Sequence, residues 1–365
     1  MATWHTLARP GESRPGLFTA DEYARQRAFF STRGGSTPLQ RLPALAAALG
    51  LGAVWVKDET ARFGLPAFKS LGVEFAVAAL QSRGGLTAGD TVVCASAGNH
   101  GRAVARAARL AGLRARIYLD DAVTVPRVDA IASEGALVVR VAGTYDDAVR
   151  LAADDAARTG ATVVSDTSYE GYEQVPRDIM LGYTRVMDDA EEQWGDDGPP
   201  DVLLVQAGVG GLLAAVASWS AWRFGQARPR LIAVEPAAAA CVQASMRAGR
   251  PTRLPGPLTT IMAGLRCGEV SPLAFDSARG LVDGAVAIDD ASCRAAMRRL
   301  ARPDGGDPAL AVGTSGAAGV GALLEVANDA GARAALGLTA GTRVMAVATE
   351  GVTEPDLWRE VTGLS

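Results

Sequence analysis

Short, valine-rich segments alternate along this chain with longer, alanine-rich segments that have the periodicity of helices. The predicted strands are 53–57, 91–95, 115–119, 137–141, 162–165, 202–206, 231–235 and 343–349. Helical patterns lie between them, among others at 103–111, 145–159, 212–224 and 291–301. Strands that alternate with helices form βαβ units, whose strands are parallel and buried on both faces. The sequence therefore predicts an α/β fold with open, twisted, mostly parallel sheets.

Length and charge narrow the classes of protein to which the chain can belong. With 365 residues it can form two lobes, and the acidic stretch 191–200 is typical of an exposed linker between elements. A net charge of −4 argues against nucleic acid as a partner, because phosphate binding needs a concentrated basic surface. Glycines interrupt the longest apolar stretch, 201–219, so a membrane partner is not expected. Residues 1–14 lack the pattern of a signal peptide.

Cysteine and histidine are too sparse to suggest a structural metal site. The chain has two histidines and four widely spaced cysteines, without a Cys-x-x-Cys pair: His5, His100, Cys94, Cys241, Cys267 and Cys293. A zinc site is hard to assemble from these residues, so no metal is expected. Reduced thiols and a cytoplasmic location are the default prediction for such a chain.

Two glycine-containing loops follow predicted strands and open predicted helices. Ser96-Ala97-Gly98-Asn99-His100-Gly101 follows the strand 91–95, and Gly208-Val209-Gly210-Gly211 follows the strand 202–206. Glycine lets a ligand approach the backbone, and the amides of a helix N-terminus favour an anion. The second loop matches neither a nucleotide P-loop nor Gly-x-Gly-x-x-Gly cleanly, which favours a phosphate cradle. An ordinary strand–helix turn is the alternative for each loop.

One lysine is out of character with a solvated surface. Lys69 follows Ala67 and Phe68 and precedes Leu71 by two positions. Partial burial lowers the pKa of a lysine amine and makes it competent for Schiff-base chemistry, whereas a snorkelling lysine at a helix start is the alternative. An amine, a phosphate cradle and a polar clamp are together what a pyridoxal 5′-phosphate (PLP) aldehyde requires.

With these residues the chain resembles the PLP-dependent enzymes of fold type II, which include tryptophan synthase β and threonine dehydratase, and in particular the diaminopropionate ammonia-lyase branch. The matching stretches keep the family's order: Thr37-Pro38-Leu39, Arg62-Phe63-Gly64-Leu65-Pro66-Ala67-Phe68-Lys69, Gly98-Asn99-His100-Gly101, Asp166-Thr167, Thr260-Ile261-Met262-Ala263-Gly264-Leu265 and Thr349-Glu350-Gly351. The resemblance implies a homodimer of two-lobed chains with PLP in the cleft between the lobes. The large lobe would comprise residues 1–71 and 188–365, and the small lobe residues 72–187.

The resemblance also implies roles for the matching residues. Lys69 would hold the cofactor and move the proton at Cα, and Asp166 would be a second catalytic carboxylate. Phe68 would border the cofactor ring, and Asn99 would bond its phenolic oxygen. The 5′-phosphate would be bound by Gly208, Val209, Gly210 and Gly211. A hydroxyl at the pyridine nitrogen, from Thr349 or otherwise from Ser315, would favour loss of a β-substituent over transamination. The substrate would be bound by Ser96, Ala97, Gly98 and His100.

One position departs from the pattern of the branch. The ammonia-lyases have Thr-Asp-Gly-Asn-His-Gly, whose aspartate takes a proton from the D-substrate, whereas this chain has Ser96-Ala97. Alanine cannot act as a base. The predicted reaction is therefore β-elimination from a small amino acid, 2,3-diaminopropionate to pyruvate and ammonia, with the L-isomer favoured. The alternatives are a serine/threonine dehydratase-like lyase, a β-replacement synthase that makes a non-standard amino acid, and a non-catalytic binding protein of this fold.

Overall fold

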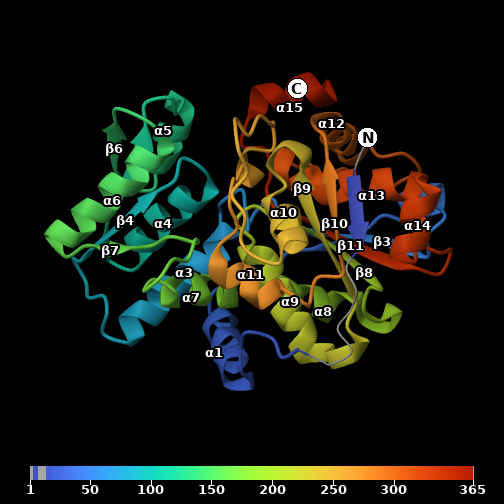
Figure 1. Cartoon of the computed structure of the whole chain (residues 1–365), viewed down its shortest axis with the longest axis horizontal. Helices are drawn as coiled ribbons and strands as arrows, with labels where there is room; N and C mark the ends of the chain where they lie inside the picture. Colours follow the sequence, from blue (N-terminus) through green and yellow to red (C-terminus); the bar gives the residue numbers. More distant parts are fainter. Residues whose placement is uncertain (1–2, 7–13, 365) are drawn as a thin grey trace. The chain divides into compact units, whose positions relative to one another are not determined.

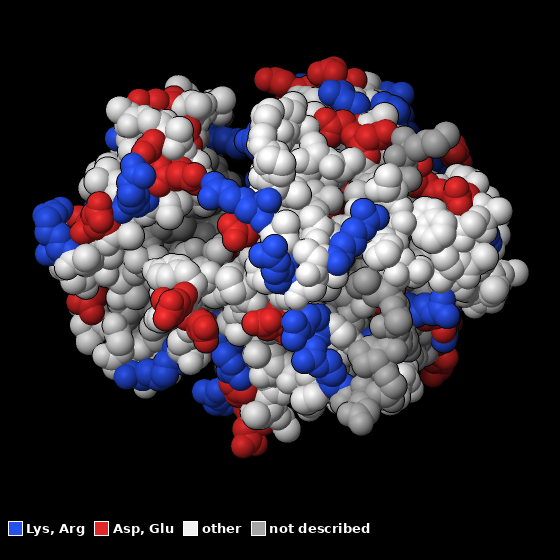
Figure 2. Space-filling view, in the orientation of Figure 1, with Lys and Arg blue, Asp and Glu red and all other residues white. Residues whose placement is uncertain are grey.

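The computed structural model describes residues 3–6 and 14–364. Contacts between residues divide the chain into two compact units, one of residues 1–68 and 184–365 and the other of residues 69–183 (Figure 1). Acidic and basic side chains are interspersed on the face drawn in Figure 2, without a continuous basic region. Among the described helices, none combines the length and the apolar composition that crossing a bilayer requires.

The larger unit is built on a seven-stranded sheet in the order β1-β10-β9-β8-β11-β3-β2. The inner strands are parallel, and the edge strands β1 and β2 pair antiparallel with β10 and β3. The strands are β1 (Thr3–Thr6), β2 (Leu39–Arg41), β3 (Ala53–Asp58), β8 (Val202–Gln206), β9 (Arg230–Pro236), β10 (Gly284–Ile288) and β11 (Arg343–Ala348). The inner strands are almost wholly buried because helices cover both faces of the sheet.

Alternate side chains of these strands form the main core of the larger unit. Val54, Leu204 and Ile232 belong to one cluster with side chains of α2, α12, α13 and α14, and their sequence neighbours point to the opposite face. The helices of this unit are α1 (Ala20–Ser31), α2 (Pro43–Leu49), α8 (Arg185–Trp194), α9 (Gly211–Phe224), α10 (Cys241–Ala248), α11 (Pro272–Ala278), α12 (Asp290–Ala301), α13 (Thr314–Asn328), α14 (Ala330–Leu336) and α15 (Pro355–Thr362).

The smaller unit has a four-stranded parallel sheet in the order β6-β5-β4-β7. Its elements are α3 (Lys69–Ser82), β4 (Thr91–Ala95), α4 (Asn99–Leu110), β5 (Arg114–Asp120), α5 (Val125–Ala132), β6 (Leu137–Val141), α6 (Tyr145–Thr159), β7 (Thr162–Val163) and α7 (Gln174–Tyr183). Alanines of α6 pack against Val93, Tyr118 and Val141 on one face. A capping box at Thr144 starts α6, and Gly160 in the left-handed conformation ends it.

The predicted α/β fold with mostly parallel sheets is confirmed, but several details differ, among them the strands β1, β2 and β10, which were not predicted. The stretch 191–200 was expected to be an exposed linker, but its first four residues complete α8, and Trp194 is buried. The acidic residues mislead because they lie on the solvent side of an amphipathic helix, where Glu191 pairs with Arg223. The predicted strand 162–165 is shorter in the structure, which assigns only Thr162–Val163 to β7.

Candidate active site

Lys69 opens α3, and the segment before it is fastened to the end of β11. The amide of Phe68 donates to the carbonyl of Thr349 at 3.2 Å, and the amide of Gly351 donates to the carbonyl of Pro66 at 2.9 Å. The Phe68 side chain is buried, while 21% of the Lys69 side chain is exposed. The lysine therefore starts a helix from a fixed backbone and keeps limited access to solvent, which fits a reactive amine better than a snorkelling one.

Lys69 forms an ion pair with Asp166, which lies 97 residues further along the chain. Its Nζ donates to Asp166 Oδ2 at 2.6 Å, and the Asp166 side chain is 17% exposed. Burial raises the pKa of Asp166, but the charge of Lys69 and its hydrogen bond outweigh that effect and hold the pKa well below its usual range. Asp166 is thus an ionised acceptor at neutral pH.

Tyr183 borders the same amine and was not predicted from the sequence. The centroid of its ring lies 5.5 Å from Lys69 Nζ, within the range of a cation–π contact. Glycines bring α3 and α7 together here: a Cβ at Gly72 would lie 2.4 Å from the Tyr183 ring, and one at Gly182 would lie 2.5 Å from the Leu71 carbonyl. The signal in the sequence is one glycine in each of the two helices, which allows them to pack closely. This signal can be recognised only once the two helices are known to pair.

The loop between β4 and α4 lies in the same unit and carries the predicted substrate-binding residues. The Ser96 hydroxyl accepts the amide of Gly98 at 3.4 Å, and Ala97 is half-buried. Asn99 is the first residue of α4, whose N-terminus no described side chain caps. His100 is buried one residue further, with Nδ1 3.7 Å from Asp166 Oδ2. The structure therefore brings together Lys69, Asp166 and His100 around one carboxylate oxygen.

The glycine loop of the larger unit has the form of a cradle for an anion. Gly208 to Gly211 connect β8 to α9, and Gly210 has φ of +92°. A Cβ at Gly208 would lie 3.1 Å from Cys267 Sγ and 3.2 Å from the Gly264 carbonyl, so a side chain would fill the space above the amides. The N-cap residue of α9, Gly210, has no side chain that could cap the helix. Its first-turn amides and its dipole therefore favour an anion at this end.

Ser315 lies beside this cradle, and Thr349 is held through its backbone. The Ser315 hydroxyl accepts the amide of Gly264 at 2.9 Å, and the Ser315 amide donates to Glu350. Gln206, at the end of β8, donates from Nε2 to the carbonyls of Ser315, Gly316 and Val347. This glutamine joins the ends of β8 and β11 to the start of α13. Sequence reasoning missed it because a buried glutamine at a strand end has no distinctive pattern.

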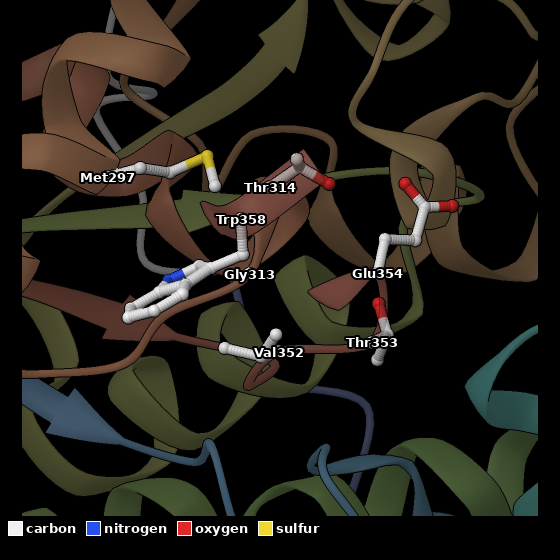
Figure 3. Close-up of a pocket in the computed structure, with 7 residues that line it drawn as sticks. All are labelled: Met297, Gly313, Thr314, Val352, Thr353, Glu354 and Trp358. Carbon is white, nitrogen blue, oxygen red and sulfur yellow. The ribbon is translucent and has the colours of Figure 1, made fainter. Parts of the chain in front are cut away.

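A small hollow elsewhere in the larger unit contains none of the predicted residues. It lies at the starts of α13 and α15 (Figure 3). Its walls are formed by Met297, Gly313, Thr314, Val352, Thr353, Glu354 and Trp358.

Comparisons with known proteins agree on the family. A family model described as pyridoxal-phosphate dependent enzyme matches residues 30–350. A diaminopropionate ammonia-lyase of Escherichia coli (strain K12) is 36% identical over 372 residues, which cover 96% of this chain and 93% of that enzyme. The chain belongs to the pyridoxal-phosphate-dependent enzymes. The resemblance seen in the sequence is thereby confirmed, and with it the assignment as an enzyme that uses PLP.

Solved structures of this PLP-dependent family have the same fold. The crystal structure of E. coli diaminopropionate ammonia-lyase in complex with an aminoacrylate–PLP azomethine reaction intermediate has a TM-score of 0.91 and 35% identity, over 99% of this chain and 97% of that chain. A threonine deaminase from T.th. has a TM-score of 0.78 and 23% identity, over 92% of this chain and 99% of that chain. The second likeness is one of fold alone.

The residues present fit a PLP cofactor. The larger unit offers an uncapped helix N-terminus behind a loop that side chains would obstruct, which suits a phosphate. The smaller unit offers a partly buried amine with a carboxylate that holds it in place. These are two of the three groups that the cofactor needs, and Asn99 at the start of α4 is the candidate for the polar clamp.

Proposed function

We propose that this enzyme eliminates ammonia from the β-carbon of 2,3-diaminopropionate and prefers the L-isomer. The observation that carries the proposal is the pairing of Lys69 with Asp166 beside a loop whose second residue is Ala97. In this arrangement Lys69 is the available base. The loop position at which the ammonia-lyase branch has aspartate is alanine, which cannot take a proton. The full-length relationship to diaminopropionate ammonia-lyases supports the choice of substrate.

Each step of the proposed reaction has a candidate residue in the chain. When bound, PLP withdraws electrons from Cα and stabilises the negative charge that develops there. Lys69 Nζ takes the proton as the Cα–H bond breaks, and Asp166 accepts it from the resulting ammonium. The same proton goes to the β-nitrogen as the Cβ–N bond breaks, so that this nitrogen leaves as ammonia. Uptake of one water then gives pyruvate and a second ammonia.

The remaining residues would hold the cofactor. The amides of Gly208, Val209, Gly210 and Gly211 would bind its phosphate, and Asn99 and Phe68 would orient its ring. Ser315 is favoured over Thr349 as the hydroxyl at the pyridine nitrogen, because its Oγ lies beside Gly264 and the glycine loop. The two units would then be the two lobes of the family.

Pyruvate release tests the proposal. PLP-loaded enzyme is incubated separately with L- and D-2,3-diaminopropionate, L-serine and L-threonine, and 2-oxo acid is measured. We expect pyruvate from the L-diamine and at least about tenfold less pyruvate from the D-diamine. Lys69→Ala should release none above background. Asp166→Asn should retain the cofactor and lose about 10²-fold in kcat. Faster release from the D-diamine, or turnover by Lys69→Ala, would refute the assignment.

A dehydratase is the second candidate. The segment Ser96-Ala97-Gly98-Asn99-His100-Gly101 has the pattern of the serine dehydratase-like branch, which favours a hydroxyl as the leaving group. In the same experiment this function predicts that L-serine or L-threonine is turned over faster than either diamine. Product analysis with added nucleophiles distinguishes both lyases from a β-replacement synthase.

A further inference from the structure

The hydrogen bond of His100 fixes which of its ring nitrogens carries a proton. His100 Nε2 lies 3.0 Å from the carbonyl oxygen of Val164, directly after β7. A carbonyl can only accept, so Nε2 is the donor and carries the hydrogen. In a neutral imidazole the other nitrogen, Nδ1, is then an unprotonated acceptor.

That acceptor is buried and faces a carboxylate oxygen. Nδ1 has no hydrogen-bond partner in the described part of the chain, and it lies 3.7 Å from Asp166 Oδ2. The same oxygen accepts Lys69 Nζ at 2.6 Å. A buried acceptor without a donor destabilises the fold, and a proton on either Oδ2 or Nδ1 would remove that cost. One more proton between Asp166 Oδ2 and His100 Nδ1 would therefore satisfy the hydrogen-bonding capacity of this group.

We infer that His100 is a positioning residue that takes up, through Asp166, the proton that Lys69 must release before its amine can act. The N–H bond of the Lys69 ammonium breaks, Asp166 Oδ2 transfers the proton, and an N–H bond forms at His100 Nδ1. Lys69, Asp166 and His100 carry charges of +1, −1 and 0 before the transfer and 0, −1 and +1 after it. The inference rests on the proposed function in that Lys69 is the amine that holds the cofactor.

The charges around His100 favour this transfer at the right moment. Burial lowers the pKa of His100, the Asp166 carboxylate raises it, and the charge of Lys69 lowers it. Once Lys69 has given up its proton, one of the two lowering effects is gone while Asp166 remains. Other ionisable groups that interact with Asp166 are Cys94, Tyr172 and Tyr183; burial raises the pKa of each, and they stay neutral. Beside the charged lysine the net shift of the His100 pKa is downward. The imidazole is therefore a stronger base once the lysine is neutral than it is beside the ammonium.

Two substitutions separate this role from a structural one. His100→Gln places an amide nitrogen near the position of Nε2 and keeps the donor to the Val164 carbonyl, but it has no base at Nδ1. His100→Asn places its amide near Nδ1 and loses the bond to Val164; that amide is not basic. The measured quantity is the rate at which cofactor-free protein captures PLP between pH 6 and 9, followed by absorbance.

Both variants should capture PLP more slowly, with the pH profile displaced upward by about one unit, which is about a tenfold loss at pH 7. A purely structural histidine predicts instead that His100→Gln behaves as wild type and only His100→Asn is impaired. That result would overturn the inference. Neither readout needs an amino-acid substrate, so absence of pyruvate from diaminopropionate would count against the proposed function alone.

Nitrogen NMR tests the premise without any substitution at His100. The chain has only His5 and His100, so ¹⁵N-histidine labelling gives two imidazoles, and His5→Gln identifies the signals of His100. We expect hydrogen on Nε2 and none on Nδ1 at pH 7 in cofactor-free protein, and proton uptake at a higher pH in Lys69→Met than in wild type. Hydrogen on Nδ1 in the resting protein, or an unchanged titration in Lys69→Met, would refute the relay.

Discussion

Asp166 Oδ2 lies between an amine at 2.6 Å and an imidazole nitrogen at 3.7 Å, and this geometry decides what the carboxylate can do. Because the pKa of Asp166 is held low, the residue accepts protons at neutral pH and releases them at once to a stronger base. It does not hold a proton at rest and so cannot act as a general acid by itself. In the proposed reaction, a proton that Asp166 passes to the leaving amine would therefore come from Lys69 in the same turnover, which favours a reaction in which one proton moves from Cα to the leaving group.

Ala97→Asp restores the residue that the ammonia-lyase branch has in this loop. Position 97 is half-buried, directly before Gly98, the N-cap of α4, and carries no acid–base group in this chain. A carboxylate there should raise kcat/KM for D-2,3-diaminopropionate by at least about tenfold, as a new general base does. The kcat/KM for the L-isomer should stay within about threefold of the wild-type value. Pyruvate release from the two isomers measures the ratio, with Ala97→Asn as the uncharged control.

An equal gain with Ala97→Asn, or none with Ala97→Asp, would show that the base at this position does not set the stereochemical preference.

Local motifs made some of these residues predictable, and long-range packing hid the others. Lys69 and the loop from Ser96 to His100 stand in short segments whose chemistry is visible in the sequence. The contact of Asp166 with Lys69 spans 97 positions, and only the resemblance to a family suggested Asp166. Tyr183 and Gln206 were missed because their neighbours come from other elements, which no local pattern reveals.

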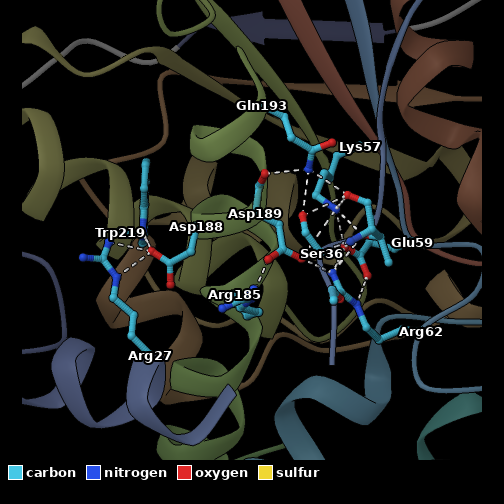
Figure 4. Close-up of polar contacts among 12 residues, drawn as sticks. Arg27, Ser36, Lys57, Glu59, Arg62, Arg185, Asp188, Asp189, Gln193 and Trp219 are labelled. Carbon is cyan, nitrogen blue, oxygen red and sulfur yellow. Dashed lines mark hydrogen bonds and ion pairs between the residues drawn. The ribbon is translucent and has the colours of Figure 1, made fainter. Parts of the chain in front are cut away.

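A turn and a buried ion network hold the segment that leads to Lys69. Arg62 and Leu65 bond each other's backbone around Phe63, which has φ of +52°. The Arg62 side chain is buried and bonds Glu59 and Asp189, and Lys57 bonds Glu59 at 2.9 Å. Figure 4 shows that the adjacent Asp188 points the other way, to Arg27 and Trp219. Neighbouring aspartates of α8 thus fasten two different parts of the larger unit.

Glu59→Gln should lower the free energy of unfolding at pH 7 by about 3–5 kcal/mol, because it removes the nearer carboxylate of the buried Lys57 and leaves Lys57 and Arg62 to share Asp189 alone. Burial raises the pKa of Glu59, but the charges of Lys57 and Arg62 outweigh it and lower the pKa from 4.5 to about 2. A carboxyl of lowered pKa stabilises the fold above its ordinary pKa, and this contribution is lost as the pH falls to about 2. The difference between wild type and variant should therefore shrink between pH 4.5 and 2.

Urea unfolding across this pH range measures both effects. Asp197→Asn is the matched control, since Asp197 pairs with Arg41 at an exposed position and its loss should cost under about 1 kcal/mol. A Glu59→Gln protein that unfolds like the control would show that the network contributes little.

Periodicity identified most strands of both sheets and several helices, but it missed β10, all of whose residues are buried, and both edge strands of the larger sheet. The strands at 91–95, 137–141 and 202–206 and the helix at 145–159 have the predicted bounds. The edge strands β1 and β2 are only four and three residues long, too short for a period to show. α13 is rich in glycine and alanine and buried almost all round, so it has no polar face to mark it as a helix.

The chain as a whole divides the candidate cofactor residues between its two units. The glycine loop, Ser315 and Phe68 belong to the larger unit, and Lys69, Asn99 and Asp166 belong to the smaller one. The α/β class of both followed from the alternation of strands and helices, whereas their bounds depend on contacts that no sequence pattern contains. The homodimer and the cytoplasmic location stay predictions, the first of which light scattering of the purified protein measures.

This division predicts different responses to PLP and to inorganic phosphate. A ligand that binds only the folded state stabilises it by RT ln(1 + [L]/Kd), about 2.7 kcal/mol at a hundredfold excess over Kd. On the proposed assignment PLP would use residues of both units, so it should raise the thermal midpoint of the wild type by several degrees, with a much smaller rise in Lys69→Ala. Phosphate needs only the amides of the glycine loop, so it should raise the midpoints of wild type and Lys69→Ala equally.

Gly210→Ala is the counterpart variant, because its φ of +92° disfavours alanine and the loop must shift to accept it. This substitution should abolish the response to phosphate while leaving the amine of Lys69 in place, so that PLP still reacts but binds more weakly. Calorimetry with chloride at equal ionic strength controls for general salt effects. If phosphate stabilised Gly210→Ala as much as wild type, the anion would bind elsewhere, and the glycine loop would lose its assignment as the phosphate cradle.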